Sequence, residues 1–358
     1  MHDSCIILPV TDKPPITVYK NYSYPLCIIS TDASESNWLC NHFGNIYLMR
    51  NRHDYIWLDF LEPNDGFDSA LEFERINLNE LEGIDIISLI QNTLNENKYV
   101  TLFLDEYYMD KTALAGKKHH LAEFFIYGYD DEKRIFYTVG FNSSEFFGQL
   151  TYSYNAVIKA HDSFVNDREK FGELPVWVIW YAFSKIKKKE NIKENSDIKT
   201  ILCELEEYAS STEMKQKLRS EIIEGRGNIA VYGADCQNEI IKSLYEMLNN
   251  DKFYTDYRHV HLLYEHKKIV LEKMRYIENV TKADVSEIID RYKSVMKKTE
   301  LAKVFFLKAI MSDNETDLYD QLKNKPIISK IIKFLEDVSN NEPAILLDFI
   351  SKVKECCN

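Results

Sequence analysis

A change of pattern at residues 185–197, KIKKKENIKENSD, constrains the fold more than any other feature of this chain. Before this run, strand-like segments dominate, whereas helical spacing of apolar residues prevails after it. A polar, charged run between two such regions is typical of a solvated connector, although it could instead meet an acidic partner. Because 358 residues exceed what one core usually serves, we expect two domains, at 1–190 and 196–358.

The first domain is predicted to contain a β-sheet with few helices. One helix is expected to begin near Cys27, and another spans about 85–94, where apolar residues recur at helical spacing. The segments of strand composition are residues 53–61, 99–104, 124–127, 134–139 and 176–183. These elements predict an α+β domain.

The second domain is predicted to be an α-helical bundle. Ser196 is a plausible N-cap, followed by an apolar stripe that begins at Ile198. Further helices are expected at about 235–248, 257–278, 283–312, 316–338 and 343–355.

Composition excludes several classes of protein. The net charge of −13 argues against a general nucleic-acid binder, which needs a basic surface. No stretch of eighteen apolar residues occurs, and the first residues do not resemble a secretion signal, so we expect a soluble cytoplasmic protein with no membrane partner. The seven cysteines are scattered without the spacing of a disulfide framework or metal site, which fits a reducing compartment.

Cys27 is the candidate nucleophile. It lies in Asn21-Tyr-Ser-Tyr-Pro-Leu-Cys27, where we expect a helix to start. A helix N-terminus or an imidazolium lowers the pKa of a thiol from about 8.5 and so favours the reactive thiolate. Cysteine is also among the most buried residue types, so a core position is the alternative. Cys5 and Cys40 are rival nucleophiles.

A base and its partner are expected on a hairpin downstream. Residues 120–142 have the pattern of two strands around a turn, and a turn centred at residue 131 sets Phe124 against Thr138 and His120 against Asn142. Directly opposed residues have Cβ atoms about 4.5 to 5.5 Å apart, so Asn142 would orient the imidazole of His120 as the base.

Alternatives remain open around this site. His119 competes with His120, because strand alternation points the two rings to opposite faces. Asp105 could orient a base or simply end a strand. His120 could be a surface residue and Asn142 a loop cap. The amide of Asn21 is a candidate oxyanion donor, beside its commoner role in turns.

Several segments resemble the butirosin-biosynthesis-protein-H-like N-terminal domains, which are similar to papain-like and C39 peptidase folds. These segments are Leu26-Cys27-Ile-Ile, residues 38–48, Leu104-Asp-Glu-Tyr-Tyr108 and Ile126-Tyr-Gly-Tyr-Asp-Asp131. The resemblance implies a papain-like fold in which a helix bearing the cysteine packs on an antiparallel sheet, with a C-terminal α-helical domain. Two positions depart from the group, because its histidine stands where this chain has Ala122 and its acidic residue where this chain has Gly140.

Within that group, the chain most resembles cysteine-protease-like amide synthetases of closthioamide-type antibiotic biosynthesis. The resemblance implies an acyltransferase that moves an acyl chain from a carrier-protein thioester to Cys27 and then to an amine such as diaminopropane. The phosphopantetheine arrives on the carrier protein, and the reaction needs no metal and no other cofactor. The alternatives are a papain-like cysteine peptidase with the same residues and a non-catalytic scaffold.

Overall fold

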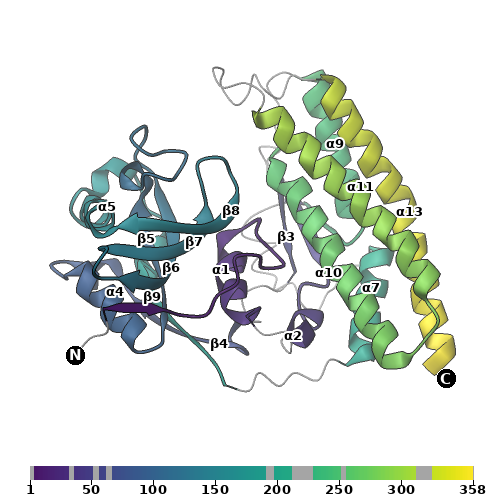
Figure 1. Ribbon diagram of the computed structural model, residues 1–358. Coiled ribbons are helices and arrows are strands. Elements are labelled where there is room, and N and C mark those ends of the chain that lie inside the picture. The colour runs from purple at the N-terminus through teal and green to yellow at the C-terminus, as the bar shows by residue number, and fades with distance from the viewer. Residues whose placement is uncertain are drawn as a thin grey trace. The chain divides into compact units, whose positions relative to one another are not determined.

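The computed structural model describes residues 4–31, 36–50, 56–61, 67–190, 197–211, 229–250, 255–311 and 325–357, and it is an α+β protein (Figure 1). The chain divides into two compact units. Unit 1 comprises Met1–Glu35 and Asn64–Ile192, and unit 2 comprises Ser36–Pro63 and Lys193–Asn358. The last boundary falls inside the charged run. The assignment of residues 36–63 to unit 2 differs from the sequence prediction, which kept them in the first domain.

Unit 1 is built on a seven-stranded antiparallel sheet. Along the main path the strands follow the order β4-β9-β5-β6-β7-β8, and β1 pairs with β6. The strands are β1 (Cys5–Ile7), β4 (Leu71–Ile76), β5 (Tyr99–Asp105), β6 (Leu121–Asp130), β7 (Ile135–Phe141), β8 (Phe147–Ser153) and β9 (Phe183–Lys188). Every described pairing in this sheet is antiparallel.

Strand β6 can pair with β1 because it is longer than β5. The pairing with β5 ends at Ile126, and β1 then pairs with Gly128, Tyr129 and Asp130. A Cβ atom at Gly128 would lie 2.5 Å from the carbonyl oxygen of Ile6, a distance that real Cβ atoms do not reach. Glycine at this position therefore allows the close approach of β1.

The helices of unit 1 have clear local causes. Helix α4 (Ile86–Asn95) begins at Asp85, which accepts hydrogen bonds from the backbone N–H groups of Ile87 and Ser88. Helix α5 (Tyr154–Asn166) is capped in the same way by Ser153. Both helices pack against β5. Figure 1 draws α4 and α5 together beside the sheet and shows α1 (Lys20–Ile29) away from them.

The strand and the connector predicted near residue 180 were both wrong in detail. Residues 176–183 were expected to form one strand, but Val176–Trp180 form the short helix α6, and β9 starts only at Phe183. Strand β9 extends into the predicted connector and pairs with both β4 and β5. The Ser184 and Ile186 side chains are buried, whereas Lys187 is exposed, so a period of two is present within the charged run.

Unit 2 contains a small sheet, of which the sequence predicted one strand, at 53–61, and assigned it to the first domain. Strand β2 (Ile46–Arg50) pairs with β3 (Ile56–Phe60) and with β10 (Ile229–Tyr232), both antiparallel. Within the described part of residues 197–357, where helices were expected, β10 is the one strand. Pairing between residues about 180 positions apart in the chain leaves no local sequence signal.

Helices form the larger part of unit 2. They are α2 (Ser36–Cys40), α7 (Ile198–Ser210), α9 (Asp235–Asn249), α10 (Tyr257–Thr281), α11 (Ser286–Met311) and α13 (Lys325–Cys357). Helix α11 packs against α10 and α13, and α13 also packs against α9 and α7. Helix α13 runs through Pro343, where two helices were predicted. Residues 316–324 of the earlier predicted helix lie outside the described residues.

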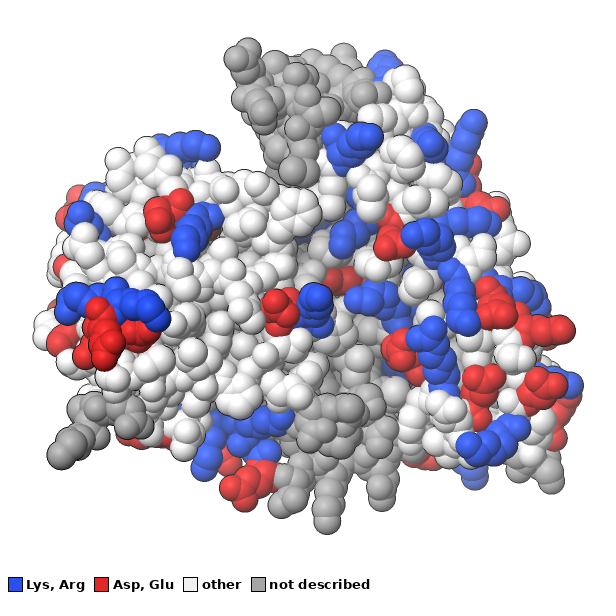
Figure 2. Space-filling model, viewed as in Figure 1, with Lys and Arg blue, Asp and Glu red and all other residues white. Residues whose placement is uncertain are grey.

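The solvent side of unit 2 is highly charged, with both signs interspersed. Figure 2 shows lysine and arginine side chains beside aspartate and glutamate side chains over these helices. Arg291 pairs with Asp348 between α11 and α13, and both side chains are about half exposed. Exposed pairs of this kind contribute only about 0 to 1 kcal/mol each, so the stability of the bundle must come mainly from its interior.

Candidate functional site

Cys27 lies near the end of α1 and not at its start, contrary to prediction. The helix starts at Lys20 and ends at Ile29, with Pro25 inside it. Seven residues at a rise of about 1.5 Å put Cys27 about 10 Å along the axis from Lys20. The N-cap Tyr19 makes no side-chain capping bond, so the sequence carries no capping signal at the true start.

The surroundings of Cys27 disfavour the thiolate. Its side chain has no exposed surface, and burial raises the pKa of its thiol, with the carboxylate of Asp12 adding to the effect. The positive end of a helix dipole acts only within the first turn, whereas Cys27 lies in the last turn, where the sign is opposite. In this structure, Cys27 is a core side chain.

The hairpin of β6 and β7 has a different register from the predicted one. Phe125 opposes Val139 and Ile126 opposes Thr138, with an irregularity between Ile126 and Gly128. Thr138 was expected opposite Phe124, so the pairing is displaced by two residues. Asp130 pairs with Ile135, so the turn comprises residues 131–134 and is not centred on residue 131. The bulge between Ile126 and Gly128 leaves one extra residue in β6.

His120 and Asn142 each have other partners. The Nδ1 atom of His120 lies 2.7 Å from Oε2 of Glu106, and half of the His120 side chain is exposed. The Oδ1 atom of Asn142 accepts hydrogen bonds from the backbone N–H groups of Ser144 and Phe146, at 2.9 and 3.1 Å. The predicted pairing of His120 with Asn142 was therefore wrong, and Asn142 caps the turn between β7 and β8.

Asn21 is not placed to act with Cys27 as an oxyanion donor. It lies exposed in the first turn of α1, six residues before Cys27. Six residues rotate a helix by about 600°, so the two side chains leave different faces. The structure does not assemble Cys27, His120, Asn142 and Asn21 into one centre.

Among the described residues of unit 1, His119 makes the shortest contact of a histidine with a carboxylate. Its Nδ1 atom lies 2.6 Å from Oδ2 of Asp105, the last residue of β5. Asp105 has no exposed surface, and Ser163 of α5 donates its hydroxyl to the same oxygen at 2.8 Å. The other oxygen accepts from the backbone N–H groups of Tyr107 and His120. Asp105 is thereby held in one position.

The ring of His119 is also fixed by its neighbours. It stacks on Tyr107 with ring centroids 4.4 Å apart, and it meets Phe171 edge to face with ring centroids 6.5 Å apart. About a third of the side chain is exposed. With Nδ1–H donating to Asp105, Nε2 carries the free lone pair, which is the arrangement of a general base. The sequence had offered both residues as alternatives, and the pairing of Asp105 with Leu121 brings them together.

A second cluster of polar groups lies at the start of α1. Lys20 Nζ and the hydroxyl of Tyr24 both donate to the backbone carbonyl of Glu123, at 3.1 and 3.0 Å. Burial lowers the pKa of Lys20 and raises that of the Glu123 carboxyl, which Lys20 partly opposes. A Cβ atom at Gly140 would lie 3.5 Å from the Tyr24 hydroxyl, so this tyrosine lies close to the backbone of β7.

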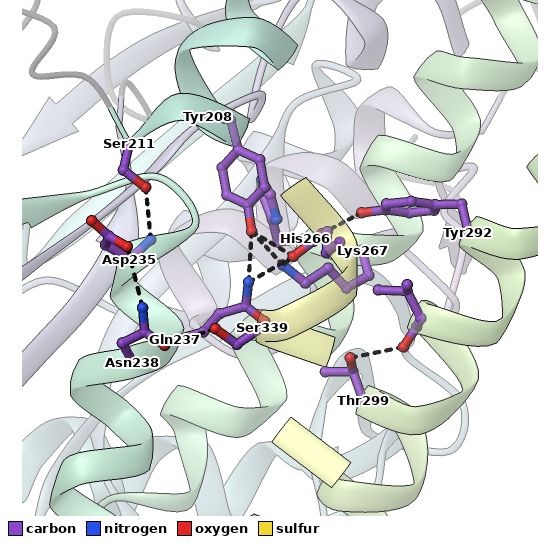
Figure 3. A network of polar contacts seen from close by, with 12 residues as sticks. Tyr208, Ser211, Asp235, Gln237, Asn238, His266, Lys267, Tyr292, Thr299 and Ser339 are labelled. Carbon is purple, nitrogen blue, oxygen red and sulfur yellow. Dashed lines mark hydrogen bonds and ion pairs between the residues drawn. The ribbon is translucent and has the colours of Figure 1, made fainter. Parts of the chain in front are cut away.

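Unit 2 holds a separate, fully buried polar network around Glu342 of α13 (Figure 3). Lys267 Nζ lies 2.8 Å from Oε2 of Glu342. Tyr208 and Gln237 donate to the same oxygen at 3.0 and 2.6 Å, and Tyr292 donates to Oε1 at 2.7 Å. These residues come from α7, α9, α10, α11 and α13. The network therefore joins five helices, and we interpret its role as structural.

The charges of this network are set by burial. Burial lowers the pKa of Lys267, and Glu342 acts in the opposite direction. Burial raises the pKa of Tyr208 and of Tyr292 well above the usual range, and the charge of Glu342 adds to both shifts. Both phenols therefore remain neutral donors to the carboxylate.

Buried histidines on α10 predict a loss of stability in acid. Burial lowers the pKa of His259 to about 4 from 6.5. As the pH falls from about 6.5 to about 4, the unfolded chain takes up a proton that the folded chain does not, so stability is lost over this window, by up to about 3 kcal/mol. His259→Gln should therefore lose less stability over this window than the natural chain. Unfolding by urea at pH 7 and pH 4.5 measures this, and equal losses would contradict it.

Within the described ranges, no group of three or more His, Cys, Asp or Glu side chains is arranged to hold a metal ion. None of the helices in those ranges combines the length and apolar character that a membrane crossing needs. Comparison of the chain with models of known protein families gives no match, and a search of curated proteins likewise finds none.

Proposed function

We propose that unit 1 is a papain-like domain that forms amides by acyl transfer, with His119 as the general base and Asp105 as the residue that positions it. The observation that carries this proposal is the 2.6 Å contact between His119 Nδ1 and the buried carboxylate of Asp105. The acyl donor is a carrier-protein thioester, and the acceptor is a small amine. The donor and acceptor rest on the sequence resemblance to amide synthetases of closthioamide-type biosynthesis.

In the proposed reaction, the amine attacks the thioester directly. The amine nitrogen adds to the carbonyl carbon, and Nε2 of His119 removes a proton from that nitrogen. The tetrahedral intermediate then collapses, the C–S bond breaks, and the phosphopantetheine sulfur leaves as a thiol after receiving the proton. The products are one amide and one thiol. No ATP is consumed, because the thioester is already activated.

Direct attack replaces the acyl-enzyme on Cys27 that the sequence suggested. The Cys27 thiol is enclosed, its pKa is raised, and it lies in the last turn of α1. A cysteine nucleophile must be accessible to the thioester carbon and must be present as a thiolate. Cys27 meets neither condition, because it is enclosed and its pKa is raised. We therefore assign Cys27 to the core and the proton transfer to His119.

A non-catalytic binding module is the second candidate. Ala122 and Gly140 occupy the positions where the resembled group has a histidine and an acid, and neither can transfer a proton. The burial of Cys27 favours this candidate too. A cysteine peptidase is disfavoured by the same features.

Amide formation can be tested with a 4-hydroxybenzoyl thioester of N-acetylcysteamine and 1,3-diaminopropane. We expect the natural chain to form the amide faster than the uncatalysed mixture, and Cys27→Ala to retain its rate within about threefold, since removal of a buried sulfur costs only about 1 to 2 kcal/mol of stability. Liquid chromatography with mass detection measures the product.

Intact-mass spectrometry of the protein from the same mixtures provides the decisive control. An acyl adduct that disappears in Cys27→Ala would restore the covalent route. No amide above the uncatalysed rate, with either this donor or a carrier-bound one, would favour the binding module.

A further inference from the structure

The short helix α6 exposes an unusual amount of apolar surface. Four residues within six positions, Val176, Trp177, Trp180 and Tyr181, are exposed to 68%, 55%, 62% and 40%. We call these four residues the α6 patch. Single exposed apolar residues are common on soluble proteins, but a contiguous group with two tryptophans marks a binding surface.

Helix α6 directs the side chains of the patch toward solvent. Helix α6 follows Pro175, and Val178 is its buried residue, at 4% exposure. Trp177 and Trp180 are three positions apart and so share one side of the helix. At the edge of the patch, the guanidinium of Arg75 lies 4.1 Å from the ring centroid of Tyr181. Two of its rings are therefore supported, Tyr181 by Arg75 and Trp177 by Phe103.

The α6 patch begins close to the His119 and Asp105 pair. The ring of Trp177 lies 5.5 Å from that of Phe103, which precedes Asp105 by two residues on β5. Residues two apart in a strand share a face and lie about 7 Å apart. On the other side, Phe171 contacts His119 and lies in the 3₁₀ turn before α6. Phe103 therefore packs on the patch two residues before Asp105, and Phe171 packs on His119 five residues before Val176.

We propose that the α6 patch binds the apolar or aromatic acyl chain of the donor, with its carbonyl directed toward His119. This inference rests on the proposed function for its assignment to the donor. The size of the patch favours a chain of this kind over a protein, because a five-residue helix is only about 7 Å long. A stable protein partner would cover about 800 Å² per side. Flat rings stack well on tryptophan, which matches an aryl or long apolar chain.

Binding can be measured without turnover by using the His119→Ala protein. The probes are the 4-hydroxybenzoyl and the acetyl thioesters of N-acetylcysteamine, titrated by isothermal calorimetry. We expect Trp180→Ala to weaken binding of the aromatic probe by about five- to tenfold, since a stacked ring pair is lost. Binding of the acetyl probe should change less than about twofold, because it carries no ring to stack on Trp180.

Val304→Ala is the matched control, because Val304 is exposed to 51% on α11 of unit 2. Equal affinity of the aromatic probe for the Trp180→Ala and Val304→Ala proteins would overturn the inference. So would a change from a dimer to a monomer on Trp180→Ala substitution, because it would make the patch a self-association surface. If the natural chain forms no amide but Trp180→Ala still weakens the aromatic probe, the binding surface stands and the proposed function fails.

Discussion

Replacing His119 by alanine is expected to lower the rate of amide formation by about 10²- to 10⁴-fold, the usual contribution of a general base. The substitution removes the ring whose Nδ1 contacts Asp105, and with it the acceptor at Nε2. Asp105→Asn should cause a loss in the same range, because it removes the carboxylate that fixes the tautomer of the imidazole. Steady-state rates with the 4-hydroxybenzoyl thioester measure both effects.

His120→Ala is the matched control for this prediction. His120 is the next residue and also pairs with a carboxylate, Glu106, but half of its side chain is exposed. We expect its rate to stay within about threefold of the natural chain, as for other exposed positions away from the chemistry. Added imidazole should partly restore the His119→Ala protein. A large loss in His120→Ala with little loss in His119→Ala would transfer the base to His120 and Glu106.

Glu342→Ala is expected to destabilise unit 2 by about 3 to 5 kcal/mol, the cost of leaving one charge of a buried pair without its partner. Lys267 would lose its carboxylate, and the buried donors of Tyr208, Gln237 and Tyr292 would lose an acceptor. Hydrogen exchange of peptides from α13 gives the local free energy of opening, which suits a chain with two units better than one global transition.

The double variant Lys267→Met with Glu342→Leu tests whether the charge causes the effect. Its loss of unfolding free energy should be much smaller than the sum of the losses in the two single variants, because no uncompensated charge remains. Asp348→Asn is the surface control, since it breaks the exposed pair with Arg291 and should cost less than about 1 kcal/mol. A loss below 1 kcal/mol in Glu342→Ala would show that the network is not central to unit 2.

Local patterns predicted the elements well where short-range signals are strong. The expected helices at about 235–248 and 257–278 correspond to α9 and α10, and Asp256 caps α10 through the N–H of Arg258. The strand expected at 99–104 is β5, whose seven residues are all buried. In each of these elements, the pattern of apolar residues in one continuous segment matches the burial of those residues in the structure.

The candidate site depended on information that a single segment does not hold. The β6 and β7 register is set by the bulge after Ile126 and by the turn after Asp130, and a shift of two residues removed the predicted partner of His120. Cys27 was placed at a helix start because nothing local marks the beginning of α1 at Lys20. The sequence contained Asp105 and His119 but could not rank them above His120 and Asn142.

By itself, the sequence determined the α+β class, the charged run between two regions of different pattern, and the chemistry available to the chain. Only the tertiary structure decided that residues 36–63 belong to unit 2, that β9 extends into the charged run, and that His119 meets Asp105. Each of these depends on which distant segments pair. Local propensity is almost the same for the competing registers and partners, so burial and hydrogen bonding across the whole chain select among them.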